Sequence, residues 1–420
     1  MSPPAAPPAR RLALLALWCV SLLLAVQLTF FGVEVARLPT NGFVAYHAAA
    51  RLLRQGAPVA RFYDDDWFEA QVAAETPGVR DNYFNPPTAA LLLLPLGGLP
   101  YGTARVIWTA FNLLVLVVAA GWLIRAAGLR GWLVPAFSIA LLASQPLREE
   151  LHQGQAYLLL LLLLTAAWCG YRSGRAGLLG ASLGLALTLK LAGIFILPLL
   201  LAQRRWRALG WTAATGLTLA LVSLPWIGLD AWWRFAGALL RLRAEPDLAV
   251  TAYQSLPGLI RHLTTGDAQW NPGPLLDAPL LGRALQVVVL LAALGVVAVV
   301  ARRADGDLAF AVAVIVGVVA SPLSLDYHYV LLFLPAAILL GRTSRNTPNS
   351  AWPLLAVLGL ALILMGADLP IHSPRLRDGW PALLAYPKLY GALLMLTLAL
   401  WASLRPGGAC GEARADPAWL

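Results

Sequence analysis

Residues 144–168, SQPLREELHQGQAYLLLLLLLTAAW, set a dense polar cluster directly against a run of leucines. The cluster contains an arginine, two glutamates, a histidine and two glutamines within residues 148–155. Charged groups beside an apolar segment long enough to enter a bilayer are costly and usually serve a function. This stretch therefore predicts a membrane protein with a polar site at the end of one of its apolar segments.

The composition agrees with a chain that lies mostly in hydrocarbon. Of 420 residues, 59% are hydrophobic and 12% charged, and the mean hydropathy is +0.70, whereas soluble domains carry about 25% charged residues. We therefore expect an all-α polytopic membrane protein. The net charge of +10 predicts no nucleic-acid partner, because the arginines are distributed one loop at a time and serve to hold cytoplasmic loops.

Apolar segments near the ~20 residues that span hydrocarbon as a helix recur along the chain. We predict about twelve transmembrane helices, within a range of roughly 10 to 13. They are expected near residues 12–32, 103–124, 132–147, 154–171, 175–188, 190–203, 208–228, 280–301, 307–322, 326–341, 352–368 and 385–403. These spans form one transmembrane domain, residues 12–403, between short tails at 1–11 and 404–420.

The arginines assign a side of the membrane to each connection. With Arg10 and Arg11 in the cytoplasm, every second connection is basic, as the positive-inside rule requires. Both termini are then cytoplasmic, and two long loops, residues 34–102 and 230–277, lie outside the plasma (inner) membrane. Nearly all the carboxylates fall on that outer face, so the active site is expected to be extracytoplasmic.

The first outer loop carries several acids beside aromatic residues. Asp64 and Asp66 belong to the acidic run FYDDDWFEAQ. A carboxylate is what transfer to a hydroxyl requires, since a general base must come within hydrogen-bond reach of the proton, and aromatic faces suit a sugar ring. The alternative is a solvated acidic loop in which Asp64 caps the following helix.

Several other polar residues on the outer face are candidates for binding substrate. They are Arg148, His152 and Gln155 in the polar cluster, Lys190 inside the apolar run LGLALTLKLAGIFILPLL, Tyr253 and Gln254 in the second outer loop, and Asp326 and His328 at the mouth of a later span. The polar cluster has an alternative role as an ion cluster that ends a span. An ammonium at Lys190 must reach the interface or find an anionic partner, either Glu149 or Glu150 or the phosphate of a lipid ligand.

The order of short motifs resembles that of the family-87 glycosyltransferases, which are membrane enzymes of the GT-C class. The matching pieces are Asn85-Pro86-Pro87, Pro95-Leu96, Gly154-Gln155, Lys190, Gln254-Ser255-Leu256, and Ser321-Pro322 with His328-Tyr329. The similarity as a whole runs from about residue 40 to 340. Each motif is short, and their order and common side of the membrane supply the specificity.

This resemblance implies a GT-C-like fold and transfer of a hexose, typically mannose, from a polyprenyl-phosphate sugar to a glycan or glycolipid acceptor. The anomeric centre would be inverted with one general base, without a nucleotide, a metal or another cofactor. Membrane lipids and the two substrates are the partners it implies. The donor phosphate would lie near Lys190 and Arg148, with the remaining binding candidates orienting the sugar or the phosphate.

One position departs from the family. Its members usually carry an acid in a pattern Asp-Phe-x-x-Tyr after the first span, and here Phe43 and Tyr46 align but Gly42 takes the acidic position. Asp64, Asp66 and Glu150 are therefore our candidates for the catalytic base. Two other functions remain open, a flippase or other transporter of lipid-linked glycans and a non-catalytic relative that binds lipid-linked sugars. A transporter predicts ionisable residues midway through several spans, whereas here they gather at one face apart from Lys190.

Overall fold

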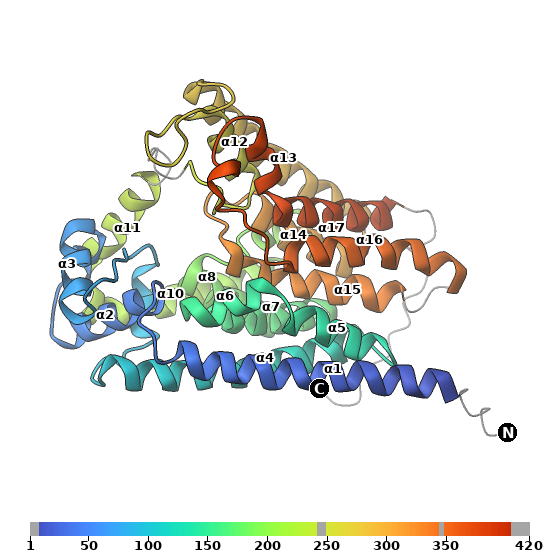
Figure 1. The fold of residues 1–420 in the computed structure, drawn as a ribbon. Coiled ribbons are helices and arrows are strands. Elements are labelled where there is room, and N and C mark those ends of the chain that lie inside the picture. The colour runs from blue at the N-terminus through green and yellow to red at the C-terminus, as the bar shows by residue number, and fades with distance from the viewer. Residues whose placement is uncertain (1–7, 242–248, 344–347, 405–420) are drawn as a thin grey trace.

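The computed structural model describes residues 8–241, 249–343 and 348–404, and all regular elements in these ranges are helices (Figure 1). This confirms the all-α class. Most of the predicted tails and part of the second predicted loop lie outside the described residues.

Among the described residues, four helices are long and apolar enough to cross a membrane. They are α1 (Pro8–Val35), α4 (Tyr101–Ala127), α10 (Trp206–Ile227) and α13 (Pro279–Arg303). A fifth span is possible if α6 (Gln145–Gln153) and α7 (Tyr157–Arg172), which meet at 118°, are counted as one. Length and composition therefore support four or five spans, fewer than the twelve expected.

Each other predicted span nevertheless contains a helix, and all of these are shorter or broken. They are α5 (Leu133–Leu142), α8 (Ala176–Lys190), α9 (Ile196–Ala202), α14 (Gly306–Val319), α15 (Phe333–Thr343), α16 (Pro348–Gly366) and α17 (Pro387–Leu404). Two of the breaks fall where the backbone turns left-handed, at Gly154 after α6 and at Leu191 after α8. These breaks bring polar helix ends into the interior of the bundle.

Short helices fill the segments between the long ones. They are α2 (Phe43–Arg54), η1 (Val59–Tyr63), α3 (Asp65–Glu75), η2 (Pro87–Leu91), α11 (Leu229–Arg241), α12 (Leu256–Thr264), η4 (Asp326–Leu332), η5 (Pro374–Leu376) and η6 (Trp380–Ala385). Figure 1 shows α2, α3 and α11 gathered at the left of the view, on the side where one end of α4 lies. There Arg241 Nη2 donates to the Tyr63 carbonyl at 3.2 Å, and the rings of Tyr63 and Phe235 lie 5.8 Å apart. The two predicted loop segments thus pack against each other.

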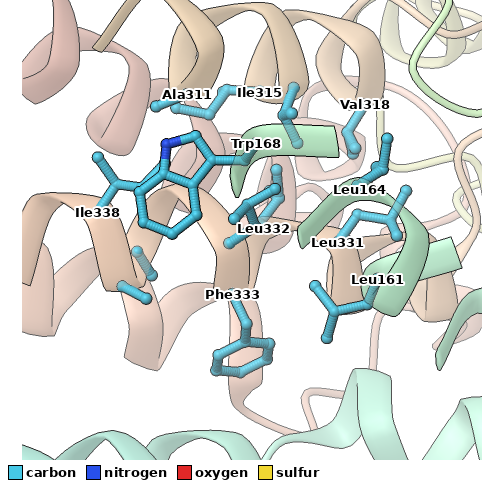
Figure 2. Close-up of a cluster of buried hydrophobic side chains, with 14 of the residues drawn as sticks. Leu161, Leu164, Trp168, Ala311, Ile315, Val318, Leu331, Leu332, Phe333 and Ile338 are labelled. Atoms are coloured by element: carbon cyan, nitrogen blue, oxygen red, sulfur yellow. The ribbon is translucent and has the colours of Figure 1, made fainter. Parts of the chain in front are cut away.

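The apolar core lies between α7, α14, η4 and α15, where Trp168 of α7 packs among aliphatic side chains (Figure 2). Its indole Nε1 donates to Asp307 Oδ1 at 2.8 Å, so the polar edge of this buried ring is satisfied. Because hydrocarbon is as apolar as the core, such close packing rather than exclusion of water holds helices together in a bilayer.

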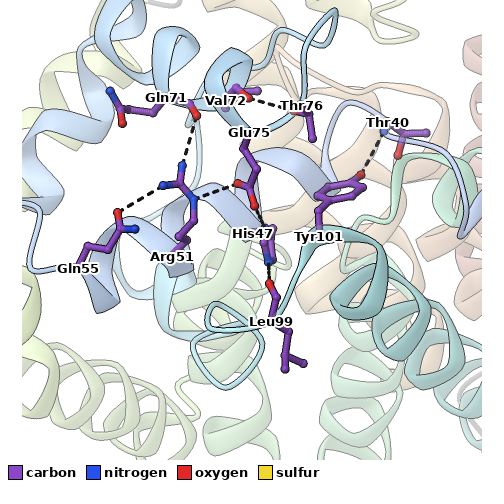
Figure 3. A network of polar contacts seen from close by, with 10 residues as sticks. All are labelled: Thr40, His47, Arg51, Gln55, Gln71, Val72, Glu75, Thr76, Leu99 and Tyr101. Carbon is purple, nitrogen blue, oxygen red and sulfur yellow. Dashed lines mark hydrogen bonds and ion pairs between the residues drawn. The ribbon is translucent and has the colours of Figure 1, made fainter.

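A polar network fixes the first loop segment against the start of α4 (Figure 3). Glu75 of α3 pairs with Arg51 at 3.0 Å and with His47 Nδ1 at 3.1 Å, both from α2. The other ring nitrogen of His47 lies 3.1 Å from the Leu99 carbonyl. Burial alone would raise the pKa of Glu75, but the hydrogen bond and charge of His47, together with Arg51, lower it overall. This clamp sets the position of α2, whose first turn enters the candidate site.

Candidate active site

Gln155, just before α7, lies at the centre of the candidate site. We call this site the cluster, and it consists of the side chains of Tyr46, Gln155, Tyr157, Lys190 and His328. Its Oε1 accepts hydrogen bonds from Lys190 Nζ at 2.7 Å and from the Tyr46 hydroxyl at 3.2 Å. These residues come from α2, from the α6–α7 turn and from the end of α8. The structure therefore joins the two motif residues Gln155 and Lys190, which stand 35 positions apart in the chain.

Lys190 presents its ammonium between aromatic faces. Nζ lies 5.3 Å from the ring centroid of Tyr46 and 5.2 Å from that of Tyr157, within the range of cation–π attraction. An ammonium has three N–H donors, and Gln155 takes one of them. The remaining donors and the positive charge suit an anionic group such as a phosphate.

Tyr157 and His328 continue the cluster on its other side. The Leu325 amide donates to His328 Nδ1 at 3.1 Å, so in the neutral ring the proton lies on Nε2. That nitrogen lies 2.6 Å from the Tyr157 hydroxyl, to which it donates. The Tyr327 ring is stacked on His328 at 4.8 Å. His328 is half-buried, so the pair forms a polar edge beside the ammonium.

Glu150, a predicted catalytic residue, lies beside the same cluster and binds the start of α7. It is fully buried, and its Oε1 accepts from the backbone amides of Tyr157 at 2.7 Å and Leu158 at 3.2 Å. These are free donors at the first turn of α7, where a negative charge is favourable. Glu150 therefore caps α7 and also lies near Lys190.

The turn between α6 and α7 is held by two residues of α4 that the sequence analysis missed. Arg105 Nη2 donates to the carbonyls of Leu151 at 2.8 Å and His152 at 2.7 Å, and Trp108 Nε1 donates to the Gly154 carbonyl at 2.8 Å. One signal for Arg105 was available. It is an arginine near the predicted outer end of a span, where the positive-inside rule places few.

Asp81 is a further acid of the first outer loop that was not among the predicted site residues, yet it reaches the cluster. Its Oδ2 accepts from the Gly42 amide, and its Oδ1 accepts from the Asn82 amide at 2.9 Å. Burial raises the pKa of Asp81 to about 6, although these bonds and the charge of Lys190 oppose the rise. The available signal was its position four residues before the Asn85-Pro86-Pro87 motif.

Other predicted residues make contacts outside this cluster. Asp64 caps α3 by accepting from the Trp67 amide at 3.3 Å, the alternative considered from the sequence, and Asp66 is exposed on the same helix. Arg148 Nη2 pairs with Asp368 Oδ2 at 3.3 Å. His152 lies 3.7 Å from Glu149, and its side chain is 42% exposed.

The remaining candidates connect separate segments. Gln254 is fully buried, and its side-chain amide donates to the carbonyls of Thr251 at 2.6 Å and Ala385 at 2.7 Å. Asp326 accepts from Gln145 at 2.9 Å and pairs with the buried Lys388 at 3.5 Å. Tyr253 lies close enough to interact electrostatically with Tyr327. The structure thus brings Gln155, Lys190 and His328 into one cluster, with Glu150 beside them.

The described residues contain no group of three or more His, Cys, Asp or Glu side chains that could hold a metal ion. The groups that face the cluster are instead an ammonium, an amide, an imidazole, carboxylates and aromatic rings. This set can bind an anion and a sugar and can move a proton.

Comparison with known proteins places these residues in a family context. A family model described as "Glycosyltransferase family 87" matches residues 83–322, more than half of the chain. A polyprenol-phosphate-mannose-dependent alpha-(1-2)-phosphatidylinositol mannoside mannosyltransferase of Mycobacterium tuberculosis is 26% identical over 419 residues, which cover 93% of this chain and 92% of that protein. No solved structure matches the chain.

Two further relatives differ in the reaction that they are named for. A polyprenol-phosphate-mannose-dependent alpha-(1-2)-phosphatidylinositol pentamannoside mannosyltransferase of Mycolicibacterium smegmatis is 29% identical, with 78% of each chain covered. An alpha-(1->3)-arabinofuranosyltransferase of Corynebacterium glutamicum is 30% identical over 58% of this chain and 54% of that protein.

Proposed function

We propose that this chain, which belongs to glycosyltransferase family 87 and is a membrane glycosyltransferase, transfers a hexose from a polyprenyl-phosphate sugar to a glycan or glycolipid acceptor. Mannose is the hexose that we propose. The names of the two mannosyltransferase relatives support both the donor and a glycolipid acceptor. The names of the relatives support the identity of the sugar less strongly than that of the lipid donor, because one relative is an arabinofuranosyltransferase.

The cluster around Lys190 carries this proposal. It joins an ammonium, a buried amide and a tyrosine–histidine pair from segments that are far apart in the chain. The ammonium suits the donor phosphate, and the aromatic faces of Tyr46 and Tyr157 suit the sugar. Lys190 would stabilise the charge that develops on the phosphate as the glycosidic bond breaks.

We further propose that the shorter helices contribute to a GT-C-like bundle of about twelve membrane segments in the plasma membrane. The loops at 34–102 and 230–277, and with them the active site, would be extracytoplasmic, and both termini would be cytoplasmic. The distribution of arginines supports this orientation, and so does the gathering of α2, α3 and α11 on one side of the molecule. Cysteine labelling from each side of the membrane tests it.

In the proposed inverting step one carboxylate acts as general base towards the acceptor hydroxyl. Glu150 lies beside the cluster, whereas Asp64 and Asp66 lie on or beside α3, and all three stay predictions for this role. Arg148, His152, Tyr253, Gln254 and Asp326 stay predictions for substrate binding. Single substitutions to alanine, assayed for transfer, test each of them.

The direct test uses the purified full-length protein in liposomes with radiolabelled polyprenyl-phosphate mannose and phosphatidylinositol mannoside as acceptor. The expected product is an acceptor lengthened by one labelled mannose. Binding of polyprenyl phosphate with no transfer, also when arabinofuranose is the donor sugar, would show a lipid-sugar-binding protein instead. Movement of the labelled donor across the bilayer without transfer would show a transporter.

Removal of one hydroxyl group at Tyr157 should weaken the reaction moderately. Tyr157→Phe keeps the ring beside Lys190 but leaves His328 Nε2 without its acceptor. The loss of one such hydrogen bond costs about 1 kcal/mol, so we expect kcat/KM to fall about 3- to 10-fold. Steady-state transfer kinetics measure this change.

Tyr171→Phe is the matched control, because Tyr171 lies at the other end of α7 and donates to Gln203 Oε1 at 2.8 Å. Its kcat/KM should stay within about twofold of the unsubstituted protein, since the lost bond lies outside the cluster. Equal losses in the two variants would show that the hydroxyl of Tyr157 supports the helix rather than the reaction.

A further inference from the structure

We propose that Asp81 is the catalytic base that accepts the proton of the acceptor hydroxyl. This inference rests on the proposed glycosyl transfer and names the group that performs its proton-transfer step. Three observations carry it. Asp81 lies beside the cluster, its carboxylate has unused hydrogen-bond acceptor sites, and there is no space for a side chain at Gly42.

Asp81 reaches the cluster through Gly42. The Gly42 amide donates to Asp81 Oδ2, and Gly42 in turn is packed against Gln155. A Cβ atom at Gly42 would lie 2.5 Å from Gln155 Nε2, so these backbone and side-chain atoms are in close contact. Because Gln155 also binds Lys190, two residues, Gly42 and Gln155, link the carboxylate of Asp81 to the ammonium proposed to bind the phosphate.

The carboxylate of Asp81 keeps capacity for a further hydrogen bond. Each oxygen accepts from one backbone amide, that of Gly42 or of Asn82, whereas a carboxylate oxygen has about two lone-pair sites. Asp81 is half-buried, so a substrate hydroxyl can approach it. A base held by rigid backbone donors is already oriented before the substrate arrives.

The electrostatic surroundings suit proton transfer near neutral pH. Burial raises the pKa of Asp81 to about 6, so most of the carboxylate is ionised at pH 7. A general base works best when its pKa lies near the working pH, and this pKa meets that condition. The charged or titratable groups that face it are Lys190 of α8, Glu69 of α3 and Tyr327 of η4.

Gly42 explains why the carboxylate comes from another segment. Its φ is +87°, a conformation in which a side chain is strained, and a Cβ there would also lie 2.6 Å from the Gln153 carbonyl. An acidic side chain at position 42 would therefore displace Gln155. The Asp81 carboxylate instead reaches the amide of Gly42 from the loop before η2.

The other carboxylates are less suitable. Glu150 is fully buried and occupied by the first amides of α7. Asp64 caps α3, and Asp66 is exposed on that helix. Asp81 alone among these four is both half-buried and bonded to a residue that touches Gln155.

The proposed step is balanced as follows. The acceptor O–H transfers its proton to an Asp81 oxygen while the acceptor oxygen forms a bond to the anomeric carbon of the donor. The bond between the anomeric carbon and the phosphate oxygen breaks on the opposite face. Its electron pair leaves with polyprenyl phosphate, whose negative charge Lys190 stabilises.

The test compares Asp81→Asn and Asp81→Ala with the unsubstituted protein in the liposome transfer assay. Loss of a general base typically costs ~10²- to 10⁴-fold in rate, so both variants should lose at least 100-fold in kcat/KM and still bind polyprenyl phosphate. In the unsubstituted protein kcat/KM should rise with pH through about 6, as Asp81 ionises, and formate should partly restore transfer by Asp81→Ala.

Glu34→Gln is the matched control, since Glu34 is an exposed carboxylate at the end of α1, and it should transfer normally. Asp81→Glu guards against misfolding of the other two variants, because it keeps the carboxylate, and it should retain partial transfer with a shifted pH limb. Activity of Asp81→Asn within tenfold of the unsubstituted protein, or an unchanged pH limb in Asp81→Glu, would overturn the role of Asp81 and leave the transferase proposal standing. No transfer by the unsubstituted protein would instead refute the proposed function, and this inference with it.

Discussion

Lys190→Met is expected to abolish transfer, with kcat/KM reduced at least ~10³-fold, while the protein remains folded in the membrane. Removal of a group that stabilises transition-state charge typically costs ~10²- to 10³-fold, and Lys190 also holds Gln155 in place. Methionine keeps the length and apolar stem of lysine but has no charge and no N–H donor. The assay is transfer from radiolabelled polyprenyl-phosphate mannose at matched protein levels.

Lys388→Met is the control, because Lys388 is the other lysine of the sequence and is buried, whereas Lys190 is half-buried. It pairs with Asp326 at 3.5 Å, and removal of one partner from a buried pair costs about 3 to 5 kcal/mol. We expect Lys388→Met to lower the thermal stability of the protein but to leave transfer by the folded fraction. An equal loss of transfer per folded molecule in both variants would contradict a specific role of Lys190.

Binding separates two roles of Lys190. If the ammonium contacts the donor phosphate, Lys190→Met should also weaken binding of polyprenyl phosphate, measured in detergent micelles, and Lys388→Met should not. Normal binding with lost transfer would place the contribution of Lys190 in the transition state alone. Unchanged transfer would exclude Lys190 from the site.

The sequence revealed those site residues whose presence is costly in an apolar segment. Lys190 and Gln155 were identified because an ammonium and a polar turn beside leucine runs need partners, and the structure shows that they are partners of each other. Asp81 was not singled out, because the first loop contains several acids and pattern alone cannot tell which one folds back onto Gly42. That contact depends on the tertiary path of the loop.

The helical class was equally predictable, but the lengths of the helices were not. Hydropathy identified apolar segments, and each predicted span does contain a helix. It also placed a boundary between the spans 175–188 and 190–203, close to the end of α8 at Lys190, although the left-handed residue that follows is Leu191 rather than the glycine that commonly ends a helix. By contrast, the left-handed break after α6 falls at Gly154 and has a readable signal.

Arg105→Met should have the second large effect, because Arg105 holds the turn between α6 and α7 that positions Gln155. Arg105 is fully buried and donates to the last carbonyls of α6, those of Leu151 and His152. Each carbonyl left without a donor costs about 1 to 3 kcal/mol. The favourable interaction of a cation with a helix C-terminus would be lost as well. We therefore expect a marked fall in thermal stability.

Transfer should fall about 100-fold in the same variant, because a displacement of the catalytic geometry by ~1 Å costs about that factor. Arg125→Met is the matched control, since Arg125 is exposed near the other end of α4. It should leave thermal stability and transfer unchanged. Activity and thermal inactivation of both variants, measured in the same liposomes, provide the comparison.

A double-mutant cycle with Trp108 shows whether the turn is held as a unit. Trp108→Phe removes the indole N–H that donates to the Gly154 carbonyl at 2.8 Å. If Arg105 and Trp108 together fix the turn, their effects on stability should couple by about 0.5 to 3 kcal/mol. Additive effects would mean that the end of α6 and Gly154 move independently, and Gln155 would then depend on only one of them. Strong coupling would make α4 the element that positions the polar cluster against Lys190.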